Sequence, residues 1–381
     1  MALAVLAIEA TAQEFHSLWL VPKNTEIGVA SPFGKGKIEP LEHGWQFTIP
    51  VSEVPQGSYI EWDMTITAKH DAPQYYALEY LDGGVWEVKD TIECTRTDDA
   101  KVKEFTAELS TLKLKNAIHN GNLVLRLHAI TKGEGRPRFL NKDNSAASVR
   151  LLGTTAPKDT TRILCVGNSF TYVSQASWML KEIAWNEGHY LDIQDALKGG
   201  QTFGQHLNLT VTEQKINDGS YEYVFLQNQS QTNAWFAQDK KKNGQILDDA
   251  LELSARIRKH SASAKLIFES TWSYPGKNNG GFASLKEFDE LLEKGTAIMA
   301  RKAKGSVSPI GKAFRICRQQ YPDIALLADD DKHQSQYGSY LKACVNYLII
   351  FKKAFTGNPQ DCSLDPQKTA KLREIAEKVV L

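Results

Sequence analysis

The sequence predicts two domains of different class: an all-β domain, and after it an α/β domain whose parallel sheet is covered by helices on both faces. The first observation is a series of short runs before residue 152 in which apolar and polar residues alternate, as in half-buried strands. The second is an alternation of apolar strands and amphipathic helices after residue 161. The third is length, because 381 residues exceed what one hydrophobic core commonly serves.

The all-β domain is expected over residues 15–152. Its strand-like runs occupy residues 45–49, 59–66, 75–80, 85–88, 123–129 and 147–151. Residues 81–84 read Leu-Asp-Gly-Gly between two of these runs, where glycines free to take positive φ predict a hairpin turn. Six or more such strands favour a β-sandwich or jelly roll.

Aromatic residues of this domain have two readings. They are Trp45, Trp62, Tyr75, Tyr76 and Trp86. Exposed aromatic rings could stack on sugar rings, whereas buried ones would form the core of the sandwich. We favour the core.

The pattern changes across residues 153–160, a small, polar segment with one proline that is typical of a linker. The α/β domain is expected over residues 161–381. Its strands are predicted at residues 162–166, 191–197, 221–226, 265–269 and 307–310, and its helices at residues 174–187, 246–260, 285–304 and 340–355. The last of these is strongly apolar and is expected to be the final helix of the chain.

Composition and charge exclude several classes of protein. Lys plus Arg and Asp plus Glu each number 45, so zero net charge gives no global attraction to nucleic acid or to an anionic membrane. No apolar run reaches 18 residues, so no membrane span is expected. The five cysteines form no Cys-x-x-Cys pair, and their odd number argues against a full disulfide framework but leaves room for one bridge.

The N-terminal segment, residues 1–13, contains Ala-Thr-Ala at residues 10–12, just before its last residue. This is the small-x-small form of a signal cleavage site. It lacks a basic start, and Glu9 interrupts its apolar stretch. It therefore predicts either a truncated signal peptide, with a periplasmic or secreted location, or a frayed N-terminus.

The feature richest in chemistry is Gly167-Asn168-Ser169, which follows the first strand of the α/β domain. Ligands of open α/β sheets bind beyond the carboxyl ends of the strands, so Ser169 is placed to face a cleft. The next helix begins nearby, and its N–H groups suit a developing oxyanion. The alternative is that Asn168 and Ser169 only cap that helix.

A base for this serine is offered by His333. A serine hydroxyl needs a base with a pKa near neutrality, and Asp330, three residues earlier, could orient the imidazole. Asp329 and Asp331 are rivals for that role, and the three aspartates could also be a metal cluster or a solvated loop. No matching set of metal ligands occurs elsewhere, so we expect neither a metal nor a cofactor.

Oxyanion donors are predicted after the second and third strands. A glycine in residues 198–202 would let a backbone N–H approach a substrate oxygen closely, although an ordinary turn would also use it. Residues 224–231, Val-Phe-Leu-Gln-Asn-Gln-Ser-Gln, end a buried strand in amides, which can donate to an oxyanion without titrating.

The order of these motifs along residues 161–357 resembles the SGNH/GDSL hydrolase superfamily. The resemblance implies a flavodoxin-like, three-layer α/β/α fold. It also implies Ser169 as nucleophile, Gly200 as oxyanion glycine, and Asp330 and His333 as the acid and base of a catalytic triad.

Two departures from the superfamily stand out. Asn168 replaces the aspartate of many members, and the third block, Gly-x-Asn-Asp, is absent. Counting from the strand puts Gln231 in the asparagine position, and a two-residue shift puts Gln229 there. The β-domain matches no specific family, and it resembles in general terms the jelly-roll accessory domains attached to secreted carbohydrate-active enzymes.

The sequence therefore predicts a serine esterase that acts on a carbohydrate and removes acetyl or another small acyl group, with an acylated glycan or a small ester as substrate. The alternatives are a lipase or thioesterase with the same triad, and a glycan-binding protein with a degenerate hydrolase domain. His206 and Trp272 are further candidates for the substrate cleft, each with a structural role as the alternative.

Overall fold

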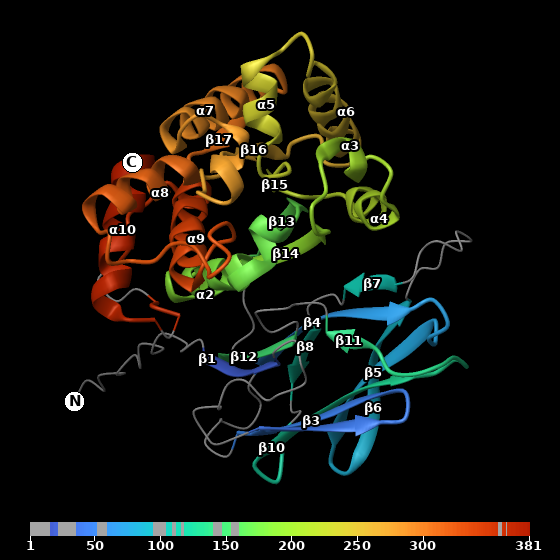
Figure 1. Ribbon diagram of the computed structural model, residues 1–381. Helices are drawn as coiled ribbons and strands as arrows, with labels where there is room; N and C mark the ends of the chain where they lie inside the picture. Colours follow the sequence, from blue (N-terminus) through green and yellow to red (C-terminus); the bar gives the residue numbers. More distant parts are fainter. Residues whose placement is uncertain are drawn as a thin grey trace, which may run out of the picture. The chain divides into compact units, whose positions relative to one another are not determined.

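The computed structural model divides the chain into two compact units, residues 1–157 and residues 158–381 (Figure 1). It describes residues 16–21, 36–51, 59–93, 104–108, 112–115, 118–139, 147–153, 160–356, 360–362 and 364–381. The N-terminal segment, residues 1–13, and residues 154–159 of the predicted linker lie outside the described residues.

The first unit contains two antiparallel sheets. One is made of β1 (His16–Val21), β4 (Tyr59–Lys69), β7 (Glu104–Glu108), β8 (Leu112–Lys115), β11 (Arg138–Phe139) and β12 (Ala147–Gly153). The other is made of β2 (Lys37–Leu41), β3 (Gly44–Pro50), β5 (Tyr75–Asp82), β6 (Val85–Glu93), β9 (Ile118–His119) and β10 (Asn122–Ala129). Each predicted run lies in a strand, and the strands that the pattern missed have six residues or fewer.

Strand β10 shows why the alternating pattern folds this way. It pairs with β3 on one side and β5 on the other, so Leu125 lies between Phe47 and Tyr80. Leu123, Leu125 and Leu127 are buried while the residues between them are half-buried. The period-two pattern thus places one row of side chains in the core.

The predicted hairpin and the aromatic residues fit this arrangement. Gly83 and Gly84 turn the chain between β5 and β6 with φ of 56° and 91°. Trp45 and Tyr76 are buried in the core, as the favoured reading predicted. Trp86 is half-buried, and the Arg126 guanidinium lies over its ring at 4.0 Å.

The second unit is organised by a parallel sheet with strand order β14-β13-β15-β16-β17. Its strands are β13 (Thr160–Gly167), β14 (Tyr190–Leu197), β15 (Tyr223–Leu226), β16 (Lys265–Glu269) and β17 (Ser306–Ser308). The chain starts inside the sheet, moves outward to β14 and then crosses back to β15. The strand order therefore reverses between β14 and β15, on the two sides of β13, and ligands of such sheets bind beyond the strand ends at that point.

Helices accompany each strand. They are α1 (Ser169–Tyr172), α2 (Ala176–Asn186), α3 (Phe203–His206), α4 (Thr210–Asp218), α5 (Thr232–Gln238), α6 (Gln245–His260), α7 (Leu285–Lys302), α8 (Ile310–Gln320), α9 (Gln336–Phe351) and α10 (Pro366–Val380), with 3-10 turns η1 (Val173–Gln175) and η2 (Lys277–Gly281). All the predicted helices are present within a few residues. The pattern missed α3, α4, α5, α8 and α10. Because α10 follows α9, the expectation that the apolar helix is the final one is wrong.

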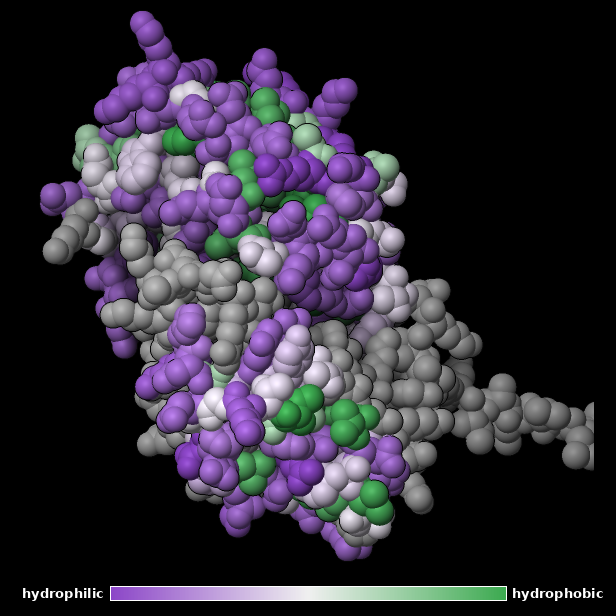
Figure 2. Space-filling view, turned by 90° about the vertical axis from the view of Figure 1, so that its right-hand side faces the viewer, coloured by the Kyte–Doolittle hydropathy of each residue, from purple (hydrophilic) through white to green (hydrophobic). Residues whose placement is uncertain are grey.

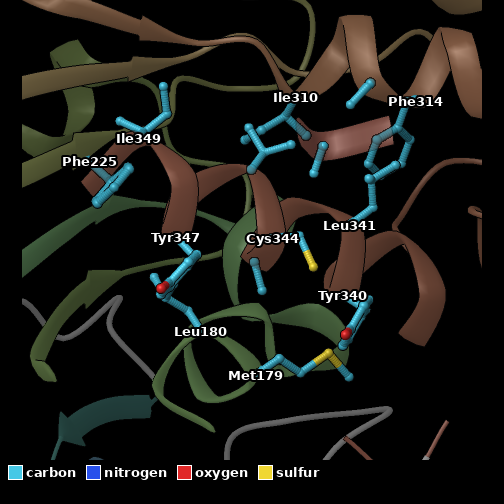
Figure 3. Close-up of a cluster of buried hydrophobic side chains, with 14 of the residues drawn as sticks. Met179, Leu180, Phe225, Ile310, Phe314, Tyr340, Leu341, Cys344, Tyr347 and Ile349 are labelled. Carbon is cyan, nitrogen blue, oxygen red and sulfur yellow. The ribbon is translucent and has the colours of Figure 1, made fainter. Parts of the chain in front are cut away.

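Alternate residues of β13 face two different apolar cores. Ile163 and Cys165 pack with α2, α8, α9 and α10, whereas Leu164 and Val166 pack with α4 and α6. Figure 3 shows the first core, in which Leu341, Cys344 and Tyr347 of α9 lie among side chains of α2, α8 and the sheet. The second unit is thus a parallel sheet with a helical layer on each face.

The surface of the protein is more polar than these cores. The face in Figure 2 is mostly hydrophilic, with apolar groups in small, separate patches. The large apolar side chains exposed among the described residues are Val85, Val88, Ile130, Trp235 and Leu381. Within the same residues, no helix is both long and apolar enough to cross a membrane.

Gly295 of α7 gives a test of this packing. A Cβ atom there would lie 1.9 Å from the Asn233 carbonyl oxygen of α5, so only glycine allows the two helices to approach. We expect Gly295→Ala to lower the free energy of unfolding by about 1–3 kcal/mol in urea titrations. Helix propensity alone predicts the opposite sign, a gain of about 0.5–1 kcal/mol.

Lys294→Ala is the matched control, because its exposed side chain lies one position away on the same helix. It should change the free energy of unfolding by less than about 0.5 kcal/mol. A stabilised Gly295→Ala protein would contradict the packing of α5 against α7.

Candidate active site

Ser169 is the first residue of α1 and follows the end of β13 by two positions. Asn168 is the N-cap, since its side-chain Oδ1 accepts a hydrogen bond from the Phe170 N–H at 3.1 Å. The capping role that the sequence left open thus falls to Asn168. The Ser169 hydroxyl is free to make another contact.

That contact is with His333. The Ser169 Oγ lies 2.8 Å from His333 Nε2, and His333 Nδ1 lies 2.5 Å from Asp330 Oδ2. A carboxylate only accepts hydrogen bonds, so Nδ1 carries the proton and Nε2 of the neutral ring accepts from the serine. Three residues from two distant segments therefore form one hydrogen-bonded chain with the polarity of a catalytic triad.

Of the three neighbouring aspartates, Asp330 is the one whose carboxylate the loop holds against His333. Its Oδ1 accepts hydrogen bonds from the backbone N–H groups of Lys332 and His333 at 3.1 and 2.9 Å. Partial burial tends to raise the pKa of Asp330, but the hydrogen bonds from the His333 ring and these N–H groups outweigh it and lower that pKa. Asp330 is therefore an ionised carboxylate that fixes the imidazole.

Gln334, next to the histidine, ties its segment to the serine segment. Its Nε2 donates to the carbonyl oxygens of Ser169 and Val173 at 3.3 and 2.6 Å. The backbone carbonyl oxygen of Gln334 accepts a hydrogen bond from the Ser174 hydroxyl at 3.1 Å. The serine and the histidine are thus held together by backbone contacts as well as by their own hydrogen bond.

Gly200 lies in a loop that is pinned beside the serine segment. Lys198 N donates to the Gly167 carbonyl at 3.1 Å, and Asn168 Nδ2 donates to the Gln201 carbonyl at 2.9 Å. Gly200 has φ of 72°, a region that favours glycine. Among the hydrogen bonds of the described residues, neither the Ser169 nor the Gly200 N–H is used, so both are available to a ligand.

The amides after β15 divide into two groups. Gln227 and Asn228 are buried and hold the surrounding backbone: Gln227 Oε1 accepts from Asn168 N at 2.9 Å, and Asn228 Oδ1 accepts from Phe203 N at 3.0 Å. Gln229 and Gln231 are half-buried. The first pair therefore joins the serine segment and the residues after Gly200 to the end of β15.

Gln229 and Gln231 differ in how their amides are held. Gln231 Nε2 donates to the Gly280 carbonyl at 2.6 Å. Gln229 Oε1 accepts from Gln231 N and from the Thr232 hydroxyl at 3.1 and 3.0 Å, which fixes the plane of its amide. Gln229 Nε2 donates to the Ser230 hydroxyl at 3.1 Å and has a second hydrogen.

His206 and Trp272 take the structural roles that the sequence left as alternatives. His206 is 1% exposed, with Nδ1 2.8 Å from the Thr212 hydroxyl and Nε2 2.9 Å from the Gly167 carbonyl. Trp272 is fully buried, and its ring stacks against that of Phe170 with centroids 4.6 Å apart. Both side chains support the serine segment from inside the core. His206 also borders a cavity of about 450 Å³ between α4 and α6.

Sequence reasoning missed the buried polar residues around the site. They are Thr171, Glu269, Gln334, Lys342 and Asn346. A signal existed for two of them, because Glu269 ends an apolar strand and Lys342 interrupts a strongly apolar helix. Such residues are almost never fully buried unless they are paired.

In the described residues, the cysteines and the other side chains that can bind metal form neither a metal site nor a disulfide. Cys165, Cys317, Cys344 and Cys362 are buried free thiols, and Cys94 lies outside the described part of the chain. No group of three or more His, Cys, Asp or Glu side chains there could hold a metal ion.

The environment of His206 generates a prediction about pH. Burial lowers the pKa of its imidazole from 6.5 to about 4, so the folded protein keeps the ring neutral while the unfolded chain binds a proton. Stability from this group is fully present above pH 6.5 and is lost as the pH falls toward 4. The loss should reach about 3 kcal/mol in urea titrations across that range.

His206→Gln keeps a donor for Gly167 but does not titrate, so its stability should depend less on pH over the same range. His260→Gln is the control, since its side chain is exposed on α6 of the same unit. Equal pH profiles for the wild type and His206→Gln would contradict the assignment.

Comparisons with known proteins agree with the fold. No family model matches the chain, and no curated protein matches it. A DUF4886 family protein from Bacteroides uniformis is 19% identical over 58% of this chain and 95% of its own, with a TM-score of 0.50. This likeness shows that the matched part of the chain shares that protein's fold.

Other solved structures similar to the chain include proteins described as an SGNH hydrolase, a GDSL-like lipase, an acetylxylan esterase and a peptidoglycan O-acetylesterase. A candidate SGNH hydrolase from Slackia heliotrinireducens is 22% identical over 50% of this chain and all of its own, with a TM-score of 0.43. A mutant acetylxylan esterase from Geobacillus stearothermophilus is 14% identical over 53% of this chain and all of its own, with a TM-score of 0.38.

Proposed function

We propose that the protein is a serine ester hydrolase. The observation that carries the proposal is the continuous hydrogen-bonded chain from Ser169 Oγ through His333 to the Asp330 carboxylate. A serine that only capped a helix would have no need of an imidazole whose tautomer is fixed by a carboxylate. The arrangement supplies what a serine nucleophile lacks in water, which is a base positioned to take its proton.

In the first half of the proposed reaction, Ser169 Oγ attacks the acyl carbon of the ester while its proton moves to His333 Nε2. The N–H groups of Ser169 and Gly200 stabilise the negative oxygen that forms on that carbon. His333 then gives the proton to the oxygen of the leaving alcohol as the carbon–oxygen bond breaks. Asp330 remains ionised and stabilises the imidazolium throughout.

In the second half, a water molecule attacks the acyl-enzyme and gives its proton to His333. The new tetrahedral carbon collapses, Ser169 regains its proton, and a carboxylic acid leaves. For the third oxyanion donor we favour Gln229 over Gln231. Each of the two amides keeps one Nε2 hydrogen. The carbonyl oxygen of Gln229 is fixed by two donors, whereas Gln231 is held through its nitrogen by the Gly280 carbonyl.

For the substrate, we propose a carbohydrate that carries acetyl or another small acyl group. The apolar side chains nearest the triad support the small acyl group, because Phe170, Trp272 and Phe314 stack against one another and are fully buried. They fill the core instead of offering a wall for a long acyl chain. The carbohydrate is supported by the predicted likeness of the N-terminal β-domain to accessory domains of carbohydrate-active enzymes. A periplasmic or secreted location is supported by the truncated signal peptide that the sequence predicts at residues 1–13.

Replacement of the nucleophile gives the primary test. We expect Ser169→Ala to lower kcat for p-nitrophenyl acetate by at least about 1000-fold, since removal of a triad serine eliminates the covalent route. Ser177→Ala is the matched control, because Ser177 lies in α2 with its Oγ directed to Asp195 at 3.5 Å. Full activity of Ser169→Ala would overturn the proposed function.

A series of p-nitrophenyl esters tests the acyl group. We expect kcat/KM to fall by at least about 10-fold from acetyl to octanoyl, because the added methylenes would have to displace packed side chains. Rising kcat/KM with chain length would instead favour the lipase or thioesterase alternative while leaving the triad intact. Release of acetate from acetylated xylan or peptidoglycan then tests the carbohydrate.

A further inference from the structure

The serine segment rests on a buried ammonium group that the proposed reaction does not use. Lys342 of α9 is 2% exposed, and its Nζ donates to the Phe170 carbonyl and the Thr171 hydroxyl, both at 3.0 Å, and to Glu269 Oε2 at 2.6 Å. An ammonium group has three hydrogens, so these contacts satisfy it completely. Two of the three acceptors belong to α1, the helix that begins with Ser169.

The partner carboxylate is equally enclosed. Glu269, the last residue of β16, is 2% exposed and accepts from Lys342 and, through Oε1, from Asn346 Nδ2 at 2.8 Å. Asn346 Oδ1 in turn accepts from the Ser308 hydroxyl at 2.7 Å. Both oxygens of the carboxylate are therefore directed by side chains of α9, and the contacts reach the end of β17.

On its other side the network reaches the residue before the nucleophile. Thr171 Oγ1 accepts from Lys342 and donates to Gln227 Oε1 at 3.2 Å. Gln227 Oε1 also accepts a hydrogen bond from the Asn168 N–H at 2.9 Å. A continuous set of hydrogen bonds thus joins the carboxyl ends of β13, β15, β16 and β17 beneath α1. Each side chain in it is 5% exposed or less.

A buried ion pair is weak evidence for stability, because apolar residues of similar volume often stabilise a core as well or better. No apolar side chain could donate to the Phe170 carbonyl or orient the Thr171 hydroxyl. Lys342 also lies on α9, which begins three residues after His333, so the helix that contacts the nucleophile segment directly follows the loop that carries the base.

We infer that Lys342 and Glu269 are a positioning pair that holds α1 so that Ser169 Oγ stays within reach of His333 Nε2. The inference deepens the proposed function and rests on it. It assigns the pair to the orientation of the nucleophile, and not to substrate binding. A loss of the pair should therefore lower the rate of acylation while leaving KM nearly unchanged, since small displacements of a reacting group slow chemistry steeply.

The first experiment measures Lys342→Met with a fluorophosphonate probe and with p-nitrophenyl acetate. We expect the rate of probe attachment at Ser169, followed by mass spectrometry, and kcat to fall by about 10- to 100-fold, with KM within about twofold of the wild type. Arg373→Met is the matched control. It breaks a largely buried ion pair with Asp361 in the same unit, at 2.6 Å, and should lower the melting temperature without changing kcat.

A second variant covers the case in which one unpaired buried charge prevents folding. Lys342→Met combined with Glu269→Met removes both charges and restores an apolar core, yet leaves the Phe170 carbonyl without its donor. We expect this protein to fold and to keep the same loss in labelling rate and kcat. Wild-type labelling rates in either folded variant would overturn the inference.

The same measurements separate this inference from the proposed function. A wild-type protein that is not labelled at Ser169 would overturn the proposed function, and the positioning role with it. Normal labelling of the wild type together with normal labelling of the Lys342 and Glu269 variants would overturn the positioning role alone.

Discussion

The ion pair between Lys342 and Glu269 is the constraint on which the arrangement of the site depends. Two charges in a low-dielectric core are tolerated only when each is paired and fully hydrogen-bonded. Here the additional partners are the Phe170 carbonyl, the Thr171 hydroxyl and Asn346. The requirement to satisfy the charges therefore fixes α1 relative to β16 and α9. The position of Ser169 follows from that restraint and from the cap at Asn168.

The topology of the sheet explains why these partners can meet. The strand order places the end of β13 between the ends of β14 and β15, so the loops after β14 and β15 flank the serine segment. Lys198 and Gln227 use this proximity to bind the Gly167 carbonyl and the Asn168 N–H. The segment between α8 and α9 brings His333 to the same edge. A parallel sheet makes this convergence possible because all of its strands end on one side.

Different parts of this structure were predictable to different degrees. The bounds of β16, residues 265–269, follow from a short apolar run between turn signals, whereas α10 was missed because its charged residues mask its apolar face. The order of motifs identified Ser169, Asp330 and His333, and the structure brings these three residues together. Lys342 and Glu269 lie 73 positions apart, and no local pattern shows which buried charge pairs with which. Contacts of that kind are set by tertiary packing and appear only in the folded chain.

The amides after β15 show how burial separates two uses of one residue type. Gln227 and Asn228 are 1% and 2% exposed, and backbone N–H groups of Asn168 and Phe203 donate to their side-chain oxygens, so these amides serve the backbone. Gln229 is half-buried, and its oxygen is fixed while one Nε2 hydrogen is left. An amide held by its oxygen presents its nitrogen in a defined direction, which is what electrostatic stabilisation of an oxyanion needs. On the proposed function, an amide two residues before Gln231 takes the place of the asparagine of Gly-x-Asn-Asp, and its buried neighbours hold the loop that carries it.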